Sequence, residues 1–158
     1  DKMQYINERE MKMSWHEFAT AAPALAEFGE KRLSSGVAYL ATVRADGSPR
    51  VHPVTPIVGE GRLMLYMEPT SPKGKDLQRD NRYQMHCAVE NQEGGGGEFY
   101  VTGRARLIGK DETDIWASVG RVGDQPKPHY ILFELSVESA FSTVYESAGP
   151  VRRRWNKE

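Results

Sequence analysis

The residues best suited to bind a ligand lie at the start of a short predicted helix, in the stretch "TSPKGKDLQRDNR". Ser71 fits the N-cap position, and Pro72 fits the first helical position. Lys73 and Lys75 follow in the first turn, where the helix dipole already presents positive partial charge. Lysines are unfavourable there alone, but a phosphate bound at the free N–H groups of the cap makes them favourable. The stretch therefore indicates a phosphate site; the alternative is a solvated surface helix.

A second candidate region is the proline-rich strand "PRVHPVTP", which contains Pro49, Pro53 and Pro56. Proline has no N–H to donate to a β-ladder, so we expect this strand to lie at an edge or to lose part of its pairing. Main-chain groups left free in this way can bind a ligand, with Arg50 supplying a charge. The alternative is an edge that is protected from aggregation.

The elements that must position these residues follow from local patterns. The stretch from Ser14 to Glu17 matches a capping box and begins a helix, and Pro23 ends that helix and opens a second one. From Gly36 the pattern changes to strands, and the Asp46-Gly47 pair marks a hairpin turn. A later helix is expected in "KDETDIWASV". The expected strand segments are VAYLATVR, PRVHPVTPIV, RLMLYME, YQMHCAV, EFYVTGRARLI, HYILFELSV and AFSTVYE, the last two forming one strand or a pair.

These strands follow one another at hairpin spacing, without the crossover helices that a doubly wound α/β fold requires. The sequence therefore predicts a mainly β, α+β fold, in which six or seven antiparallel strands form a closed or partly open barrel with flanking helices. Residues 1–13 are polar and are expected to be a flexible N-terminal segment, followed by a single domain over residues 14–158.

Composition excludes several function classes. The formal net charge of -1 argues against nucleic-acid binding by bulk electrostatics, and no apolar run approaches the roughly 20 residues of a membrane span. The N-terminal segment lacks the apolar core of a secretory signal, and a single cysteine suits a cytoplasmic protein without an intrachain disulfide. No metal-site spacing is present among His16, His52, His86, Cys87 and His129.

The order and spacing of "PRVHPVTP", "LMLYM", "SPKGKDLQRDNR" and "EFYVTGRARLI" resemble the pyridoxamine 5'-phosphate oxidase-like flavoprotein superfamily, from about Gly36 to Ile108. The resemblance implies the FMN-binding split barrel and an oxidoreductase that transfers hydride to or from a small-molecule substrate. It also implies a homodimer with the cofactor sites at its interface. The substrate and the catalytic residues are not identified by the sequence.

The resemblance assigns cofactor contacts by position. The Arg that opens the proline-rich strand meets the phosphate, the rest of that strand and part of the next line the isoalloxazine, and a Lys binds the phosphate. We add a Ser hydroxyl beside that Lys, and an aromatic side chain near the C-terminus that reaches a partner subunit or the ligand. The expected cofactor-binding residues are Arg50, Val51, His52, Pro53, Val54, Thr55, Tyr66, Met67, Ser71, Lys73 and Trp155.

Two alternatives share this scaffold. One is a reductase dependent on the deazaflavin F420, whose anionic tail needs a basic groove such as Arg79, Arg82 and the Arg152 to Arg154 run can provide. The other is a flavin or haem carrier without turnover, with His52 or His86 as a haem ligand. Oxidation of pyridoxamine phosphate itself is not expected, because the chain ends three residues after Trp155, without the substrate-binding tail of the true oxidases.

Overall fold

The computed structural model describes residues 14–158, and the segment predicted to be flexible, 1–13, lies outside the described residues. The described chain begins with α2 (Trp15–Ala21) and α3 (Pro23–Ser34), as the sequence predicts. The main-chain N–H of Glu17 donates to Ser14 Oγ at 3.3 Å, and Pro23 occupies the first turn of α3. Two further helices follow, α4 (Pro72–Arg79) and α5 (Thr113–Val122), and none of the described helices is long and apolar enough to cross a membrane.

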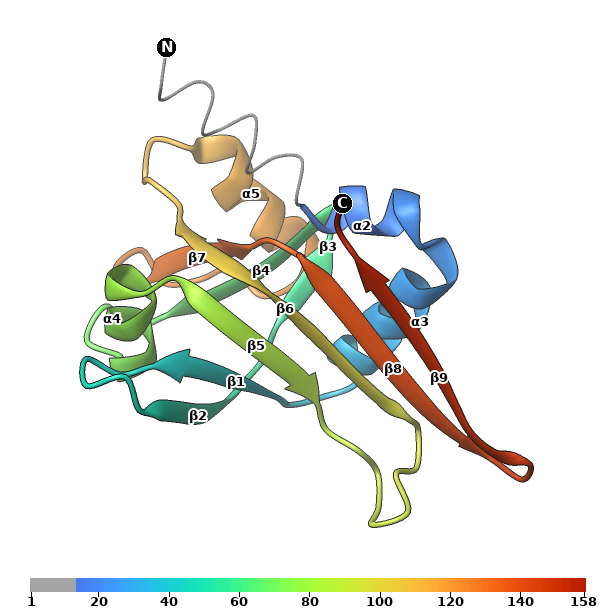
Figure 1. The fold of residues 1–158 in the computed structure, drawn as a ribbon. Coiled ribbons are helices and arrows are strands. Elements are labelled where there is room, and N and C mark those ends of the chain that lie inside the picture. The colour runs from blue at the N-terminus through green and yellow to red at the C-terminus, as the bar shows by residue number, and fades with distance from the viewer. Residues whose placement is uncertain (1–13) are drawn as a thin grey trace.

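Nine strands in the described chain form one antiparallel sheet. Seven of them lie in the order β2-β1-β5-β6-β7-β4-β3, and β8 pairs with both β6 and β9. The sheet curls into a barrel (Figure 1). Because the two ends of the seven-stranded path, β2 and β3, are not paired with each other, the barrel stays open along one side. The strands are β1 (Ala38–Val43), β2 (Pro49–Val54), β3 (Ile57–Gly59), β4 (Arg62–Met67), β5 (Arg82–Cys87), β6 (Glu98–Leu107), β7 (Ile131–Leu135), β8 (Ser139–Glu146) and β9 (Gly149–Asn156).

The predicted mainly β, α+β split barrel with flanking helices is confirmed, with two differences in its strands. The segment expected as one strand up to Val58 divides after Val54, and its second part, β3, turns to pair with β4. The C-terminal residues form β9, which pairs with β8 along its whole length, so the basic run Arg152 to Arg154 is part of the sheet.

The longest strand, β6, joins the two halves of the barrel. One edge of β6 pairs with β5, while the other pairs first with β8 and then, from Ala105, with β7. Gly103 lies at this change of partner, where a Cβ atom would clash with the main-chain oxygen of Ser136. The same oxygen accepts a hydrogen bond of 2.6 Å from the Tyr83 hydroxyl. The crossing of the two halves therefore depends on the absence of a side chain at position 103.

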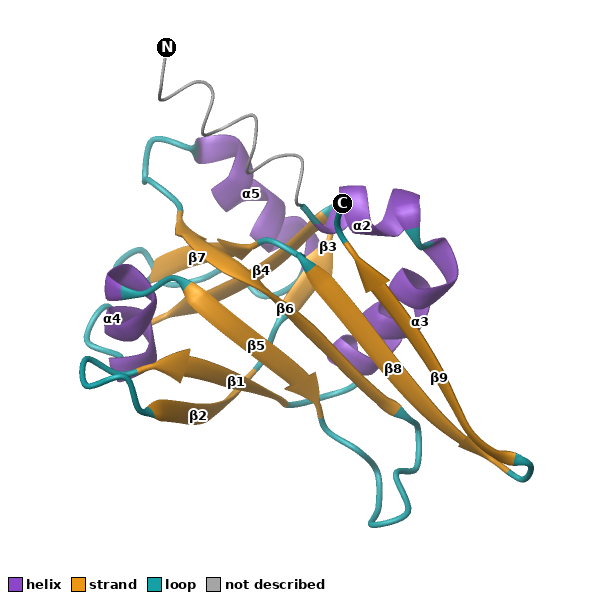
Figure 2. Cartoon of the chain, viewed as in Figure 1, coloured by secondary structure: helices purple, strands orange, loops and turns teal. Residues whose placement is uncertain are grey.

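The core lies on the concave side of the sheet and is covered from two directions. Helices α2 and α3 bury the larger cluster, which includes Phe18, Leu33, Leu40 and Phe99. Helix α5 covers a smaller cluster, whose buried members are Ile57, Met64, Ile108, Ile115, Val119 and Leu132. Figure 2 shows that α4 lies apart from α2, α3 and α5, beside the β1–β2 hairpin.

The opposite face of the sheet has no helical cover. In Figure 1, α3 passes behind β8 and β9, and no helix lies in front of β5, β6 or β8. Aromatic contacts run across this face: His86 stacks on Tyr100 at 6.0 Å, Tyr100 lies 5.2 Å from Phe141, and the Arg154 guanidinium lies 5.3 Å from the Phe141 ring. These residues belong to a row in which each residue is the register partner of the next on the neighbouring strand. We call this row, including its two ends, the aromatic row: Pro53, Tyr39, His86, Tyr100, Phe141 and Arg154.

Candidate functional site

A cavity of about 580 Å³ opens where the end of β2, the end of β4 and the start of α4 meet. Its volume falls within the range of small-molecule sites in proteins. Seven of the eleven residues predicted to contact a cofactor line it, although they come from three separate segments. The lining residues are Val37, Pro53, Val54, Thr55, Leu65, Tyr66, Met67, Glu68, Ser71, Lys73, Asp124 and Tyr130.

The polar end of the cavity is the first turn of α4. The half-buried Lys73 ammonium donates a hydrogen bond to Ser71 Oγ at 2.9 Å, and among the described residues it has no carboxylate partner. Burial lowers the pKa of Lys73, because a low-dielectric surrounding disfavours the charged amine. Gly74 lets α4 approach β4 closely, since a Cβ there would lie 3.0 Å from Met67 Sδ. The arrangement leaves an uncompensated cation beside main-chain N–H groups that attract anions.

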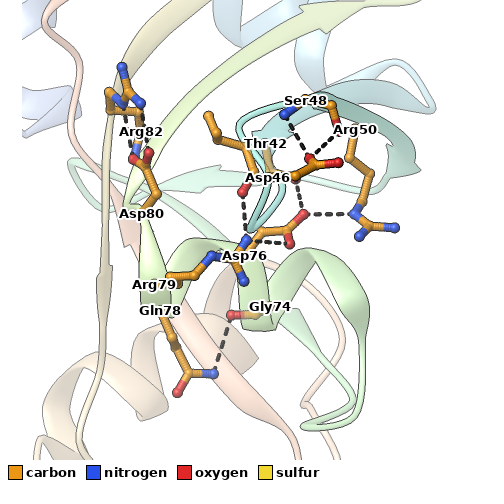
Figure 3. Close-up of polar contacts among 11 residues, drawn as sticks. Thr42, Asp46, Ser48, Arg50, Gly74, Asp76, Gln78, Arg79, Asp80 and Arg82 are labelled. Carbon is orange, nitrogen blue, oxygen red and sulfur yellow. Dashed lines mark hydrogen bonds and ion pairs between the residues drawn. The ribbon is translucent and has the colours of Figure 1, made fainter.

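The Arg that opens β2 does not line the cavity but is held at the same helix (Figure 3). Arg50 Nε donates to Asp76 Oδ2 at 2.7 Å, and Asp76 lies in α4 one turn after Lys73. The same oxygen accepts from Thr42 Oγ1 at 2.7 Å, and Arg79 Nη2 donates to Oδ1 at 3.0 Å. Burial raises the pKa of Asp76, but these three hydrogen bonds and the Arg50 charge outweigh burial and hold the pKa below its usual value.

Three other predicted residues also fail to line the cavity. Val51 is 64% exposed, and His52 is half-buried on β2 opposite Leu40. Trp155 lies on β9, where its ring is 5.1 Å from the ring of Phe18. Within one chain, the predicted residues from the end of β2 onward, from β4 and from the start of α4 therefore line the cavity. Val51, His52 and Trp155 do not line it.

The structure adds a residue to the cavity that sequence reasoning did not propose, Tyr130. Its ring stacks on Tyr66, with centroids 5.6 Å apart and an angle of 24° between the planes. The loop that carries it is fixed, because Lys110 Nζ donates to the main-chain oxygen of Tyr130 and His129 Nε2 lies 2.9 Å from Glu68. Burial raises the pKa of Tyr66, so its hydroxyl stays protonated. The far wall of the cavity is therefore aromatic and rigid, and it also includes the carboxylate of Asp124.

A family model described as pyridoxamine 5'-phosphate oxidase matches residues 22–143 of the sequence. The chain belongs to this family. The matched range includes every residue of the pyridoxamine 5'-phosphate oxidase family member that lines the cavity. No curated protein sequence matches the chain.

Solved structures with low sequence identity share the fold of this family member. PhzG from Burkholderia lata 383, in complex with tetrahydrophenazine-1-carboxylic acid, is 15% identical with a TM-score of 0.62, over 90% of this chain and 84% of its own. A heme binding protein from Mycobacterium smegmatis is 18% identical with a TM-score of 0.57, over 80% of this chain and 57% of its own. HutZ, a heme storage protein from Vibrio cholerae, is 17% identical with a TM-score of 0.56, over 74% of this chain and 89% of its own.

The cavity of the family member suits a planar ligand with an anionic group. A cation and a hydroxyl lie at one end, the wall is mainly apolar and aromatic, and Glu68 and Asp124 add two carboxylates to the lining. Within residues 14–158, no group of three or more His, Cys, Asp and Glu side chains is placed to hold a metal ion. The cation and the aromatic wall together can bind and orient such a ligand.

Proposed function

We propose that the chain binds FMN in the 580 Å³ cavity and acts as an oxidoreductase that transfers hydride to or from a small molecule. The observation that carries the proposal is the half-buried Lys73 ammonium, which shares the cavity with the stacked Tyr66–Tyr130 pair. Partial burial disfavours a cation without a carboxylate partner, and an anion bound beside it would offset this cost. FMN unites a phosphate with a planar ring system, so it matches both ends of the cavity.

In this proposal the residues have separate roles. Lys73, Ser71 and Arg50 hold the phosphate through charge-assisted hydrogen bonds. The residues that line the ring system are Pro53, Val54, Thr55, Tyr66 and Met67. Bound FMN supplies the hydride chemistry, so the protein needs no strong acid–base pair. The protonated Tyr66 hydroxyl is a neutral hydrogen-bond donor beside the ring.

The two alternatives have less support from side-chain positions. Of the arginines proposed for the F420 tail, Arg79 and Arg82 are paired with Asp76 and Asp80, and Arg152 to Arg154 lie on β9 and do not line the cavity. His52 and His86, proposed for haem, do not line the cavity, and His86 stacks on Tyr100 in the aromatic row. Both alternatives remain outcomes of the test below.

The absorption spectrum of the purified protein, followed by titration with FMN, tests the proposal. We expect flavin bands in the blue and near-ultraviolet, and saturable FMN binding by calorimetry. A single violet band would assign F420, and a sharp Soret peak would assign haem. Either band, in a protein that does not bind FMN, would overturn the proposal.

A second copy of the chain completes the proposed site. The cavity opens at Pro53, which also belongs to the uncovered aromatic row, so a copy packed on the row would also wall the cavity. Aromatic residues are enriched in protein interfaces, and a two-fold pair is the commonest oligomer. We place this homodimer in the cytoplasm, since the single cysteine Cys87 is a free thiol.

A further inference from the structure

A buried carboxylate connects the proposed phosphate site to the strands beside it. The side chain of Asp76 is only 4% exposed and accepts hydrogen bonds from Thr42 in β1, Arg50 in β2 and Arg79 in its own helix. Figure 3 shows these groups converging on the carboxylate from the two strands and the helix. Asp76 thus joins three elements at the base of α4.

An acidic residue is an unexpected choice at this position. It lies one helical turn from Lys73, where its charge opposes binding of a phosphate. Burying a carboxylate is also costly, and apolar side chains of similar volume often stabilise a fold as well as a buried ion pair does. Packing alone therefore does not explain why this position holds a carboxylate.

The hydrogen bond that Arg50 makes supplies that explanation. Arg50 uses Nε for Asp76, and the residues that the structure describes give its two terminal nitrogens no hydrogen-bond partner. In Figure 3 these nitrogens extend away from the carboxylate. A guanidinium has five N–H donors in one rigid plane, so anchoring Nε fixes the plane and leaves four donors for an oxyanion. The side chain is 23% exposed, so these donors are accessible to a ligand.

We propose that Asp76 is a positioning residue, which holds the Arg50 guanidinium with its terminal N–H groups free for the phosphate of the cofactor. The inference rests on the proposed FMN function. Asp76 acts through Arg50 and does not touch the cofactor. Arg79, the second cation on the carboxylate, offsets the remaining negative charge, so that Asp76 orients Arg50 without repelling the phosphate.

The test separates phosphate recognition from ring binding by comparing FMN with riboflavin, which lacks the phosphate. Calorimetric titrations give the ratio of the two dissociation constants for the wild type, Asp76→Asn and the control Asp80→Asn. Asp80 is the C-cap residue of α4 and pairs with the exposed Arg82, so the control makes the same substitution outside the site. We expect Asp76→Asn to weaken FMN binding about tenfold, the equivalent of one charge-assisted hydrogen bond, and to leave riboflavin binding unchanged.

The outcomes distinguish three accounts. Equal losses of FMN and riboflavin affinity would mean that Asp76 only supports the fold, and an unchanged preference for FMN would mean that Arg50 needs no anchor; both overturn the inference. A wild type that does not prefer FMN over riboflavin would overturn the proposed phosphate site itself. In the Arg50→Ala background, Asp76→Asn should cause no further loss of FMN affinity.

A second variant decides the matter if Asp76→Asn does not fold. Arg50→Lys keeps the charge, but a single amine cannot both pair with Asp76 and present a planar pair of donors. We expect it to lose most of the preference for FMN. Full retention of the preference would show that charge alone suffices, and would overturn the inference.

Discussion

Lys73 is the residue on which the proposed function depends most directly. Replacing it with alanine removes one charge-assisted contact, worth roughly 1.5–3 kcal/mol, so we expect FMN affinity to fall about tenfold or more. Lys75 provides the matched control, because it is exposed in the same turn and does not line the cavity. Titration of both variants, with circular dichroism to verify folding, checks the prediction. Equal losses of FMN affinity at the two positions would mean that Lys73 attracts the phosphate only by its charge and makes no specific contact.

Asp76 leads to a prediction about pH. Its pKa is lowered in the folded state, from an unfolded value of about 3.9. The ionised cluster therefore contributes stability that is fully present above about pH 4 and is lost as the pH falls through the folded-state pKa. Urea titrations between pH 3 and 7 should show Asp76→Asn less stable than the wild type at neutral pH, with a difference that narrows below about pH 4. A constant difference across this range would contradict the lowered pKa.

Some residues of the candidate site could be predicted from the sequence because their signals are local. Ser71 and Lys73 stand out within a single helical turn, where charge and cap can be read together. Tyr130 could not be found in this way, because it meets Tyr66 only when β7 pairs with β4. Arg50 was predicted, but the carboxylate that anchors it belongs to a different element, and no local pattern connects the two.

At the scale of elements, the change of partner along β6 is the most sensitive point. Gly103→Ala places a methyl group against the main-chain oxygen of Ser136, which flexible side chains cannot relieve. We expect a loss of about 1–3 kcal/mol in the free energy of unfolding, and a Tm lower by at least about 2 °C. Gly123→Ala is the control, since nothing lies within 4 Å of the added Cβ and the φ angle of -148° suits any residue. Thermal unfolding of both variants gives the comparison, and similar Tm values would refute it.

The order of the elements was predictable, whereas strand β9 and the division between β2 and β3 were not. Hairpin turns and alternating apolar residues indicate most of the sheet from local sequence. Strand β9 lacks this signal, because its residues from Pro150 to Arg154 are all exposed and show no alternation. Its pairing with β8 depends on a hairpin turn with Gly149 at a φ angle of 121°. Strand β3 has only three residues, too few to show a period.

At the scale of the whole molecule, the uncovered aromatic row makes the proposed dimer testable. Light scattering should give twice the chain mass of 17.8 kDa for the wild type. Tyr39→Glu places a charge at an exposed position in the row, so it should give a mass near 17.8 kDa and weaker FMN binding. Val122→Glu, which places the same charge at an exposed apolar position on α5, should remain dimeric. A wild type of 17.8 kDa that binds FMN would show that one chain builds the site alone.

The three tryptophans all lie outside the cavity wall. Trp15 packs against Phe18, which also contacts Trp155 of β9, while Trp116 donates its indole N–H to Gly109 in the region of α5. Their fluorescence therefore follows the docking of the helices on the sheet, whereas the visible colour of a bound flavin would follow the cavity. A single unfolding experiment that records both signals can thus reveal whether the ligand leaves before the helices separate or together with them.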